Sequence, residues 1–364
     1  MLMMMAFLGW YILATLATGS QPASWYQVVK MSELLALCLY VVENAGRFSL
    51  TSLVVAVVLG TTIESVLAWM QFINQQSMGL WLFGERSFSG QTPGIALVDV
   101  FGNQMLRPYG TFSHPNVLAG YLVLSTTTIL AAMLLGRLSR KHFWLTFCSW
   151  CLGASALFIT FSRTGWLVGT CASLFLFSSW FISIKSQTVV FPKRSFVLTL
   201  IVSVTLLIVS LLLGPLVVDR FASLSSTDSH SFLLRQKLTV VALTVISQHP
   251  LFGVGPNNFL GVLPALFPLE ETIRWIQPVH TVFLLIAAES GLVGLALMVS
   301  LCVAAILNSC QQYRHGDQTG LMRCLLMAVI LLMSLTDHYF WTLQQGQLLF
   351  FIVLGLALSR QRVQ

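Results

Sequence analysis

Residues 281–307 read TVFLLIAAESGLVGLALMVSLCVAAIL and carry a single charged side chain, Glu289. An α-helix needs about 20 consecutive apolar residues to cross the hydrocarbon core of a bilayer. This stretch therefore predicts a membrane-spanning helix, and similar stretches recur along the chain.

The composition of the whole chain is that of a polytopic membrane protein. Only 9% of its 364 residues are charged, 56% are hydrophobic, and the mean hydropathy is +0.83. A soluble domain usually carries about 25% charged residues, and disorder requires low hydrophobicity with high net charge, so both classes are excluded. The net charge of +7 comes from 19 Lys and Arg spread thinly along the chain. It does not indicate nucleic-acid binding.

Ten apolar runs predict an all-α transmembrane bundle that forms a single integral membrane domain over residues 1–364. The runs cover residues 3–18, 26–46, 50–74, 117–136, 144–162, 165–184, 196–216, 281–307, 322–338 and 344–359. The first lacks a basic leading segment and a small-residue cleavage site, so we interpret it as a span and not as a signal peptide. Two long segments, 75–116 and 217–280, connect spans on one side, and the second contains a predicted helix over 229–248.

The basic residues predict the orientation. If the ten helices alternate, 11 of the 19 Lys and Arg fall in short connections on one side, which the positive-inside rule assigns to the cytoplasm. We therefore expect the protein to lie in the cytoplasmic membrane. Both termini would be in the cytoplasm, and both long segments would be on the outer side. The rule leaves eight external basic residues unexplained: Lys30, Arg86, Arg107, Arg163, Arg220, Arg235, Lys237 and Arg274.

Three external arginines are candidate ligands for an anion. Arg163 lies in the turn FSRTGW (161–166) between two spans. There it could reach lipid headgroups or hold a phosphate through its bidentate guanidinium. Arg220 and Arg235 lie in the 217–280 segment with Lys237. Each alone is typical of a solvated loop, but several that converge would form a clamp for a pyrophosphate.

His280 is the candidate general base. It lies at the outer end of the 281–307 span, where it could be an interfacial cap or could accept a proton from a substrate in a cavity, since a pKa near 6.5 suits proton transfer. Glu289 lies nine residues further along the same helix. We expect it to pair with a buried polar group such as Arg163.

Two further external turns carry polar residues. In GTFSHPNVLAGY (110–121), Pro115 and Asn116 can start and cap the next helix, whereas His114 has a structural or a functional role. In DHYFWTLQQGQ (337–347), Asp337, His338 and Tyr339 could line the same cavity as His280. Trp341 is assigned to the aromatic belt at the membrane interface.

Nucleotide and metal sites are not indicated. The segment HPLFGVGPNNF (249–259) contains Gly253-x-Gly255, but it lacks the strand and helix context of a phosphate-binding loop. We expect it to redirect the chain at the membrane edge. No metal-ligand spacing appears, so no metal and no cofactor are expected, and a metal-assisted nucleotide-sugar transferase is disfavoured.

Together these motifs, in this order over roughly residues 50–360, resemble the O-antigen ligase/polymerase family. The resemblance implies a membrane glycosyltransferase of the GT-C type. Such an enzyme moves a glycan from an undecaprenyl-pyrophosphate carrier to an acceptor on the outer face of the cytoplasmic membrane. The acceptor would be lipid A–core, a growing polysaccharide or a protein, and the sequence does not distinguish these.

The resemblance also assigns residues. His280 matches the essential histidine of the family, Arg220 and Arg235 resemble its pyrophosphate-binding arginines, and Arg163 matches its Ser-Arg element. Asn258 matches the asparagine that closes the glycine-rich turn. Thr281 departs from the asparagine that often follows the family histidine. The family also commonly has more spans than the ten predicted for this chain, so we expect the missing pair at the N-terminus.

Two other classes remain open. A transporter or flippase of an anionic lipid-linked glycan would use the same arginines, but it gives His280 no special role and predicts matching broken spans in inverted repeats. A scaffolding membrane protein would not need arginines at the external ends of spans.

Overall fold

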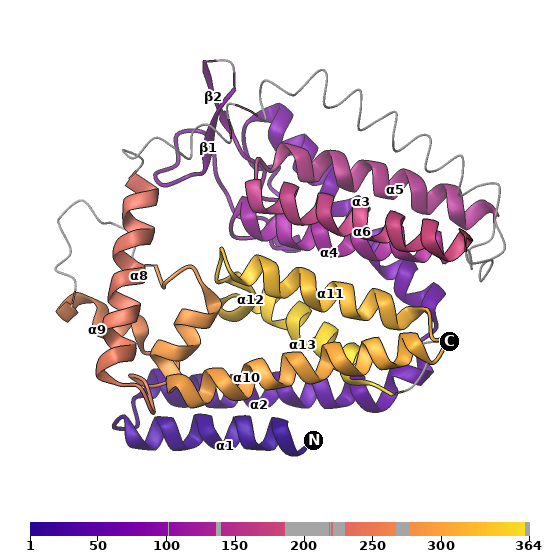
Figure 1. Cartoon of the computed structure of the whole chain (residues 1–364). Coiled ribbons are helices and arrows are strands. Elements are labelled where there is room, and N and C mark those ends of the chain that lie inside the picture. Colours follow the sequence, from indigo (N-terminus) through magenta and orange to yellow (C-terminus); the bar gives the residue numbers. More distant parts are fainter. Residues whose placement is uncertain are drawn as a thin grey trace. The chain divides into compact units, whose positions relative to one another are not determined.

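The computed structural model describes residues 1–100, 102–135, 140–185, 218, 220, 230–266 and 277–360. The protein is predominantly α-helical, as predicted, and its described residues form two compact units (Figure 1). Unit 1 comprises residues 1–47 and 227–363, and unit 2 comprises residues 48–226 together with Gln364. The expectation of a single domain stays a prediction.

Nine of the ten predicted spans coincide with helices. The remaining run, 196–216, lies outside the described residues, as does Arg274. In the described part of the chain, five helices are long and apolar enough to cross a membrane, and three more are apolar but shorter. The total of ten spans stays a prediction.

Unit 2 is built around one central helix. Its helices are α3 (Leu50–Asn74), α4 (Pro115–Leu134), α5 (Arg140–Ile159) and α6 (Arg163–Lys185). In the apolar stretch of α4, 89% of the residues are buried inside the protein. The corresponding shares for α3, α5 and α6 are 28%, 39% and 33%. Because α4 packs against the other three, it forms the core, and its neighbours leave apolar faces for lipid.

The segment between α3 and α4 is folded. It contains a short 3-10 helix, η2 (Trp81–Phe83), and an antiparallel hairpin of β1 (Leu97–Val100) and β2 (Asn103–Leu106). The hairpin is not among the elements predicted from the sequence. Gln71 and Glu64 of α3 hold the end of this segment, since Gln71 Oε1 accepts from the Gly110 amide and Glu64 accepts from Thr111.

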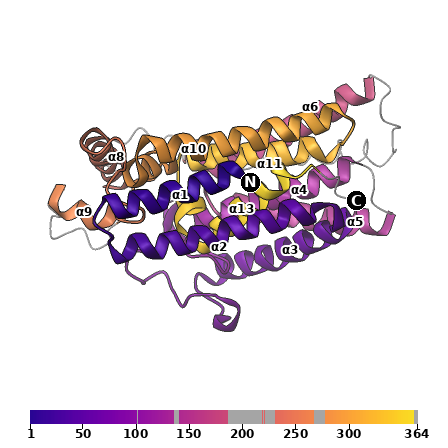
Figure 2. The same ribbon diagram turned by 90° about the horizontal axis from the view of Figure 1, so that it is seen from below.

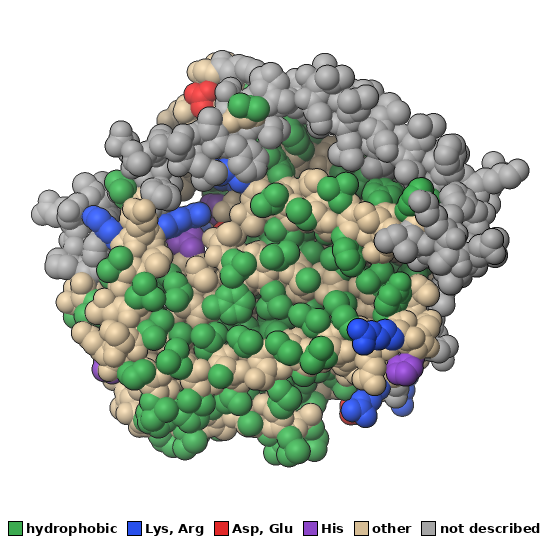
Figure 3. Space-filling model, in the orientation of Figure 1, with side chains coloured by type: hydrophobic (Ala, Val, Ile, Leu, Met, Phe, Trp, Pro, Cys, Tyr) green, Lys and Arg blue, Asp and Glu red, His purple; other side chains and the backbone are tan. Residues whose placement is uncertain are grey.

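Unit 1 contains the other helices that the structure describes. They are α1 (Leu2–Ala17), α2 (Pro22–Asn44), η1 (Ala45–Arg47), α8 (His230–Gln248), α9 (Phe259–Leu266), α10 (Val282–Arg314), α11 (Thr319–Ser334), α12 (Tyr339–Thr342) and α13 (Gln344–Leu358). Helix α10 packs against α1, α8, α11 and α13, and Figure 2 shows α1 and α10 side by side. Hydrophobic side chains dominate the face over these two helices in Figure 3, with Lys and Arg at its margins.

Helix α10 is broken inside its apolar run. Gly291 has φ +72° and ψ 176°, which interrupts the helix. The turn that follows α8 packs into the break. The amides of Val254 and Gly255 donate to the carbonyls of Ala288 and Glu289, and the Leu292 amide donates to the Pro250 carbonyl. The expectation that the glycine-rich turn redirects the chain at the membrane edge stays a prediction, and the structure adds that this turn packs against the broken helix. A broken helix at membrane depth is stable only where its freed backbone groups find such partners.

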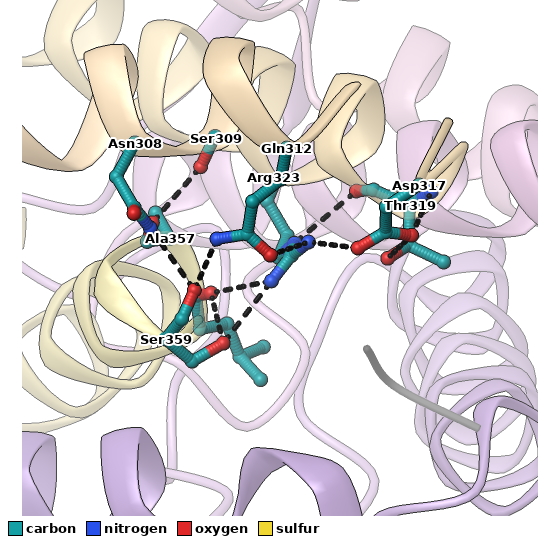
Figure 4. A network of polar contacts seen from close by, with 9 residues as sticks. Asn308, Ser309, Gln312, Asp317, Thr319, Arg323, Ala357 and Ser359 are labelled. Carbon is teal, nitrogen blue, oxygen red and sulfur yellow. Dashed lines mark hydrogen bonds and ion pairs between the residues drawn. The ribbon is translucent and has the colours of Figure 1, made fainter. Parts of the chain in front are cut away.

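Arg323, one of the 11 basic residues assigned to the cytoplasmic side, also has a packing role. Its side chain is 1% exposed and forms an ion pair with Asp317. Its guanidinium also donates to Ser359 Oγ and Gln312 Oε1 (Figure 4). This arginine joins the ends of α10, α11 and α13, so it acts in packing as well as in any orientation signal.

Trp341 does not belong to an interfacial belt. It is 2% exposed and lies among Phe7, Phe350 and Phe351. Tyr339 is equally buried, and its hydroxyl contacts the Met333 sulfur. The last turn before α13 therefore turns these two rings into the core of unit 1.

Candidate active site

Two of the predicted arginines lie together in unit 2. Phe161, at φ +52°, reverses the chain between α5 and α6, and Ser162 Oγ accepts from the Gly165 amide to cap α6. Arg163 is therefore the first residue of α6, at its positive end. Its guanidinium donates to the Arg220 carbonyl over 3.2 Å, and Arg220 Nε donates to the Phe161 carbonyl over 3.3 Å.

The electrostatics of this pair favour an anion. Partial burial, and then the charge of Arg163, lower the pKa of Arg220 below its ordinary value. Two guanidinium groups held close beside a helix N-terminus repel each other, and a bound phosphate would relieve that repulsion.

A third arginine, not singled out from the sequence, reaches the same turn. Arg107 is buried, and it donates to the Thr160 carbonyl over 2.7 Å and to Asn116 Oδ1 over 2.8 Å. The expectation that Asn116 caps α4 is wrong, because His114 Nδ1 accepts the Asn116 amide while Pro115 occupies the first turn. Asn116 instead orients Arg107. The sequence pointed to Arg107 only as one of the eight external basic residues that the positive-inside rule leaves unexplained.

His280 lies in unit 1, just before α10. Its Nδ1 is buried and has no hydrogen-bond partner among the described residues. Its ring meets that of His338 edge to face, with centroids 5.6 Å apart. His338 is itself held, because its Nδ1 lies 2.7 Å from Thr342 Oγ1 and its amide donates to Asp337 Oδ1. The structure thus brings His280 and His338 together, whereas a cavity that they share with Asp337 and Tyr339 stays a prediction.

The surroundings keep His280 neutral. Burial, and then the charge of Arg235, lower its pKa from 6.5 to about 4. Burial also lowers the pKa of His338, against the opposing effect of Asp337. A neutral imidazole with an unused nitrogen can accept a proton at physiological pH.

Arg235 lies on α8, which is close to the predicted helix 229–248. The buried side chains Leu238, Val241 and Val245 pack this helix against the unit, and α8 contacts α10. Arg235 itself is exposed on α8, and its charge acts on both His280 and His338. Arg235 is therefore placed with the histidine pair.

Glu289 holds the glycine-rich turn. Its carboxylate is buried and accepts from the amides of Asn257 and Phe259. The buried polar partners that the structure shows for Glu289 are therefore backbone groups, whereas Arg163 was the example given from the sequence. Asn258 Nδ2 donates to the Val254 carbonyl and closes the turn from within. Both residues hold the 249–259 segment against α10.

Thr281, which stands where the family often has asparagine, makes a hydrogen bond of its own. Its hydroxyl donates to the Leu335 carbonyl over 3.2 Å. This bond joins the start of α10, next to His280, to the end of α11, close to His338.

Possible metal ligands are dispersed. Among the residues that the structure describes, no three of His, Cys, Asp and Glu are grouped so as to hold a metal ion. The expectation of a metal-free site stays a prediction.

The fold and these residues define a polytopic helical membrane protein with a histidine held neutral and a pair of arginines suited to an anion. Residues 147–299, which include Arg163, Arg220, Arg235 and His280, match the sequence profile of the family described as O-Antigen ligase. This match supports assignment of the chain to the O-antigen ligase family and indicates a glycosyltransferase of the ligase/polymerase type. No match was found among curated proteins.

Proposed function

We propose that this protein transfers a glycan from an undecaprenyl-pyrophosphate carrier to an acceptor hydroxyl on the outer face of the cytoplasmic membrane. The acceptor would be a lipid, a growing polysaccharide or a protein. The observation that carries the proposal is His280, whose buried Nδ1 lacks a hydrogen-bond partner among the described residues and whose pKa is lowered.

His280 is proposed as the general base. Its neutral ring takes the proton of the acceptor hydroxyl while the acceptor oxygen attacks the anomeric carbon. The bond from that carbon to the carrier oxygen breaks, and undecaprenyl pyrophosphate leaves with the electron pair. This single displacement inverts the anomeric configuration and is expected to need no metal.

The arginines are proposed to bind the pyrophosphate. Arg163 and Arg220 lie beside each other at the start of α6, and Arg235 contributes its charge near His280. Guanidinium groups stabilise the negative charge that develops on a leaving pyrophosphate. His114, Asn116, Asn258, Glu289 and His338 would support the site by positioning these residues.

Substitution of His280 tests the proposal. His280→Ala should abolish glycan transfer in cells while the protein still reaches the membrane, and His338→Ala, which leaves the proposed base in place, should retain partial transfer. Transfer that continues unchanged in His280→Ala would remove the basis of the proposal.

A flippase for the same lipid-linked glycan is the second candidate. The break in α10 at Gly291 favours it, because transporters build their sites from interrupted spans. Purified protein distinguishes the two. A transferase forms a new glycosidic bond, whereas a flippase moves the intact lipid between leaflets.

A further inference from the structure

Three large apolar side chains project from the segment between α3 and α4. Trp81, Leu82 and Phe83 form η2 and are 73%, 75% and 75% exposed. We call residues 80–83, which also include the partly exposed Leu80, the apolar tip. Single exposed hydrophobic residues are ordinary, but consecutive ones of this size mark an interaction surface.

The apolar tip is held in shape by a buried carboxylate. Glu85 is 5% exposed, and its two oxygens accept from the amides of Met78 and Leu80, each over 2.6 Å. The flanking glycines Gly79 and Gly84 have φ values of +81° and +91°, which permit the tight turns. The segment thus turns its charge inward and its apolar side chains outward, the reverse of a water-facing loop.

The same carboxylate fixes the position of the apolar tip. Gln71 Nε2, in the last turns of α3, donates to Glu85 over 2.9 Å. Helix α3 is long and apolar enough to span a membrane, and one stripe along it is exposed. The stripe consists of Val55, Leu59, Ile63, Val66, Met70 and Ile73. The apolar tip is therefore anchored at the end of a lipid-facing helix.

We propose that the apolar tip is an interfacial anchor that inserts into the bilayer leaflet at which α3 ends. Tryptophan favours the boundary between headgroups and acyl chains, and Leu and Phe favour the acyl side of that boundary. Arg86, exposed directly after the turn, would face the headgroups. A small buried cluster follows the apolar tip in the same segment and consists of Phe88, Leu106 and Tyr109. The anchor would therefore also fix the depth of the segment that carries Arg107.

Fluorescence quenching in vesicles tests this proposal with the full chain. A fluorescent amino acid is placed at Leu82 or, as the matched control, at the exposed Gln91 of the same segment, and the protein is reconstituted in phosphatidylcholine with brominated acyl chains. We expect brominated lipid to quench the probe at position 82 several-fold more than the probe at position 91, and aqueous iodide to do the reverse. Substituting Trp81→Ser and Phe83→Ser around the probe should weaken lipid quenching without changing the elution of the protein in detergent.

Two results would overturn the proposal. Equal iodide quenching at both positions would place the apolar tip in water. Protection of position 82 from both quenchers would mean that a second copy of the chain or another protein covers it.

Discussion

At the scale of single residues, the proposed chemistry depends on a histidine that stays neutral. His280 combines a lowered pKa with a buried Nδ1 that has no hydrogen-bond partner among the described residues. Its neighbours explain the lowered pKa, because burial and the charge of Arg235 disfavour the imidazolium. The residue that the sequence singled out is thus neutral at physiological pH and is a weaker base than an ordinary histidine.

The pH dependence of transfer should report this shift. The pKa of His280 falls from 6.5 to about 4, so the base remains unprotonated as the pH drops through 6.5 and is lost only nearer pH 4. The acid limb of kcat/KM, which reflects the free enzyme, should therefore lie well below 6.5. An acid limb at the ordinary histidine value would contradict this assignment.

Neutralising either paired arginine should weaken donor use. A hydrogen bond to a charged group is worth about 1.5–3 kcal/mol, so Arg163→Gln or Arg220→Gln should lower kcat/KM for the lipid-linked donor about 10- to 100-fold. The control is Arg47→Gln, which removes an exposed cation whose Nη1 donates to Asn44 Oδ1. Equal losses in all three variants would show a general charge effect and no anion site.

The buried ion pair makes a prediction about stability alone. Asp317→Ala leaves the Arg323 guanidinium, 1% exposed, without its counterion, and breaking a buried pair in this way costs about 3–5 kcal/mol. The thermal midpoint in detergent should fall clearly. The pair Lys30–Glu33, whose glutamate side chain is 63% exposed, supplies the control, since Glu33→Ala should change the midpoint little.

At the scale of elements, the sequence predicted the helices well and their irregularities poorly. Long apolar runs locate spans because the bilayer dictates their length, and the 229–248 helix corresponds closely to α8 (His230–Gln248). The break at Gly291 left no comparable pattern, because a lone glycine in an apolar run does not reveal which backbone packs against it. For the same reason, the pairing of Glu289 with the turn amides could not be derived from spacing.

The break itself can be tested at Gly291. A Cβ at this position would collide with the Leu251 carbonyl, so Gly291→Ala should displace the turn from α10, lower stability and reduce transfer. Gly316→Ala is the matched control, since Gly316 has a similar positive φ of +90° but nothing near its missing Cβ. If both variants lose the same amount of stability, backbone strain and not the packed turn accounts for the loss.

At the scale of the whole molecule, composition and charge predicted a membrane protein with an oriented bundle. The orientation still depends on the positive-inside rule, and Arg323 shows that one of its cations has a packing role. Candidate site residues could be chosen from the sequence because cations and histidines are rare in this chain. Their mutual contacts could not, since Arg163 meets Arg220 and His280 meets His338 across gaps of 57 and 58 residues.

The orientation can be tested by labelling in intact cells. A cysteine at Gln91 should react with a membrane-impermeant maleimide added outside, whereas one at Gly316 should react only after the cells are opened. Both long segments lack native cysteines, so the external background should be low. The reverse pattern would place the arginines and His280 on the cytoplasmic side and contradict the proposed reaction.

Glycan transfer by the purified protein tests the central claim most directly. The protein is reconstituted with a labelled undecaprenyl-pyrophosphate-linked glycan and offered lipid A–core, a second lipid-linked glycan or a protein as acceptor. We predict that label moves to one of these acceptors, that undecaprenyl pyrophosphate is released, and that His280→Ala does neither. Movement of the intact lipid-linked glycan across the bilayer without any new glycosidic bond, or equal transfer by His280→Ala, would contradict the proposed function.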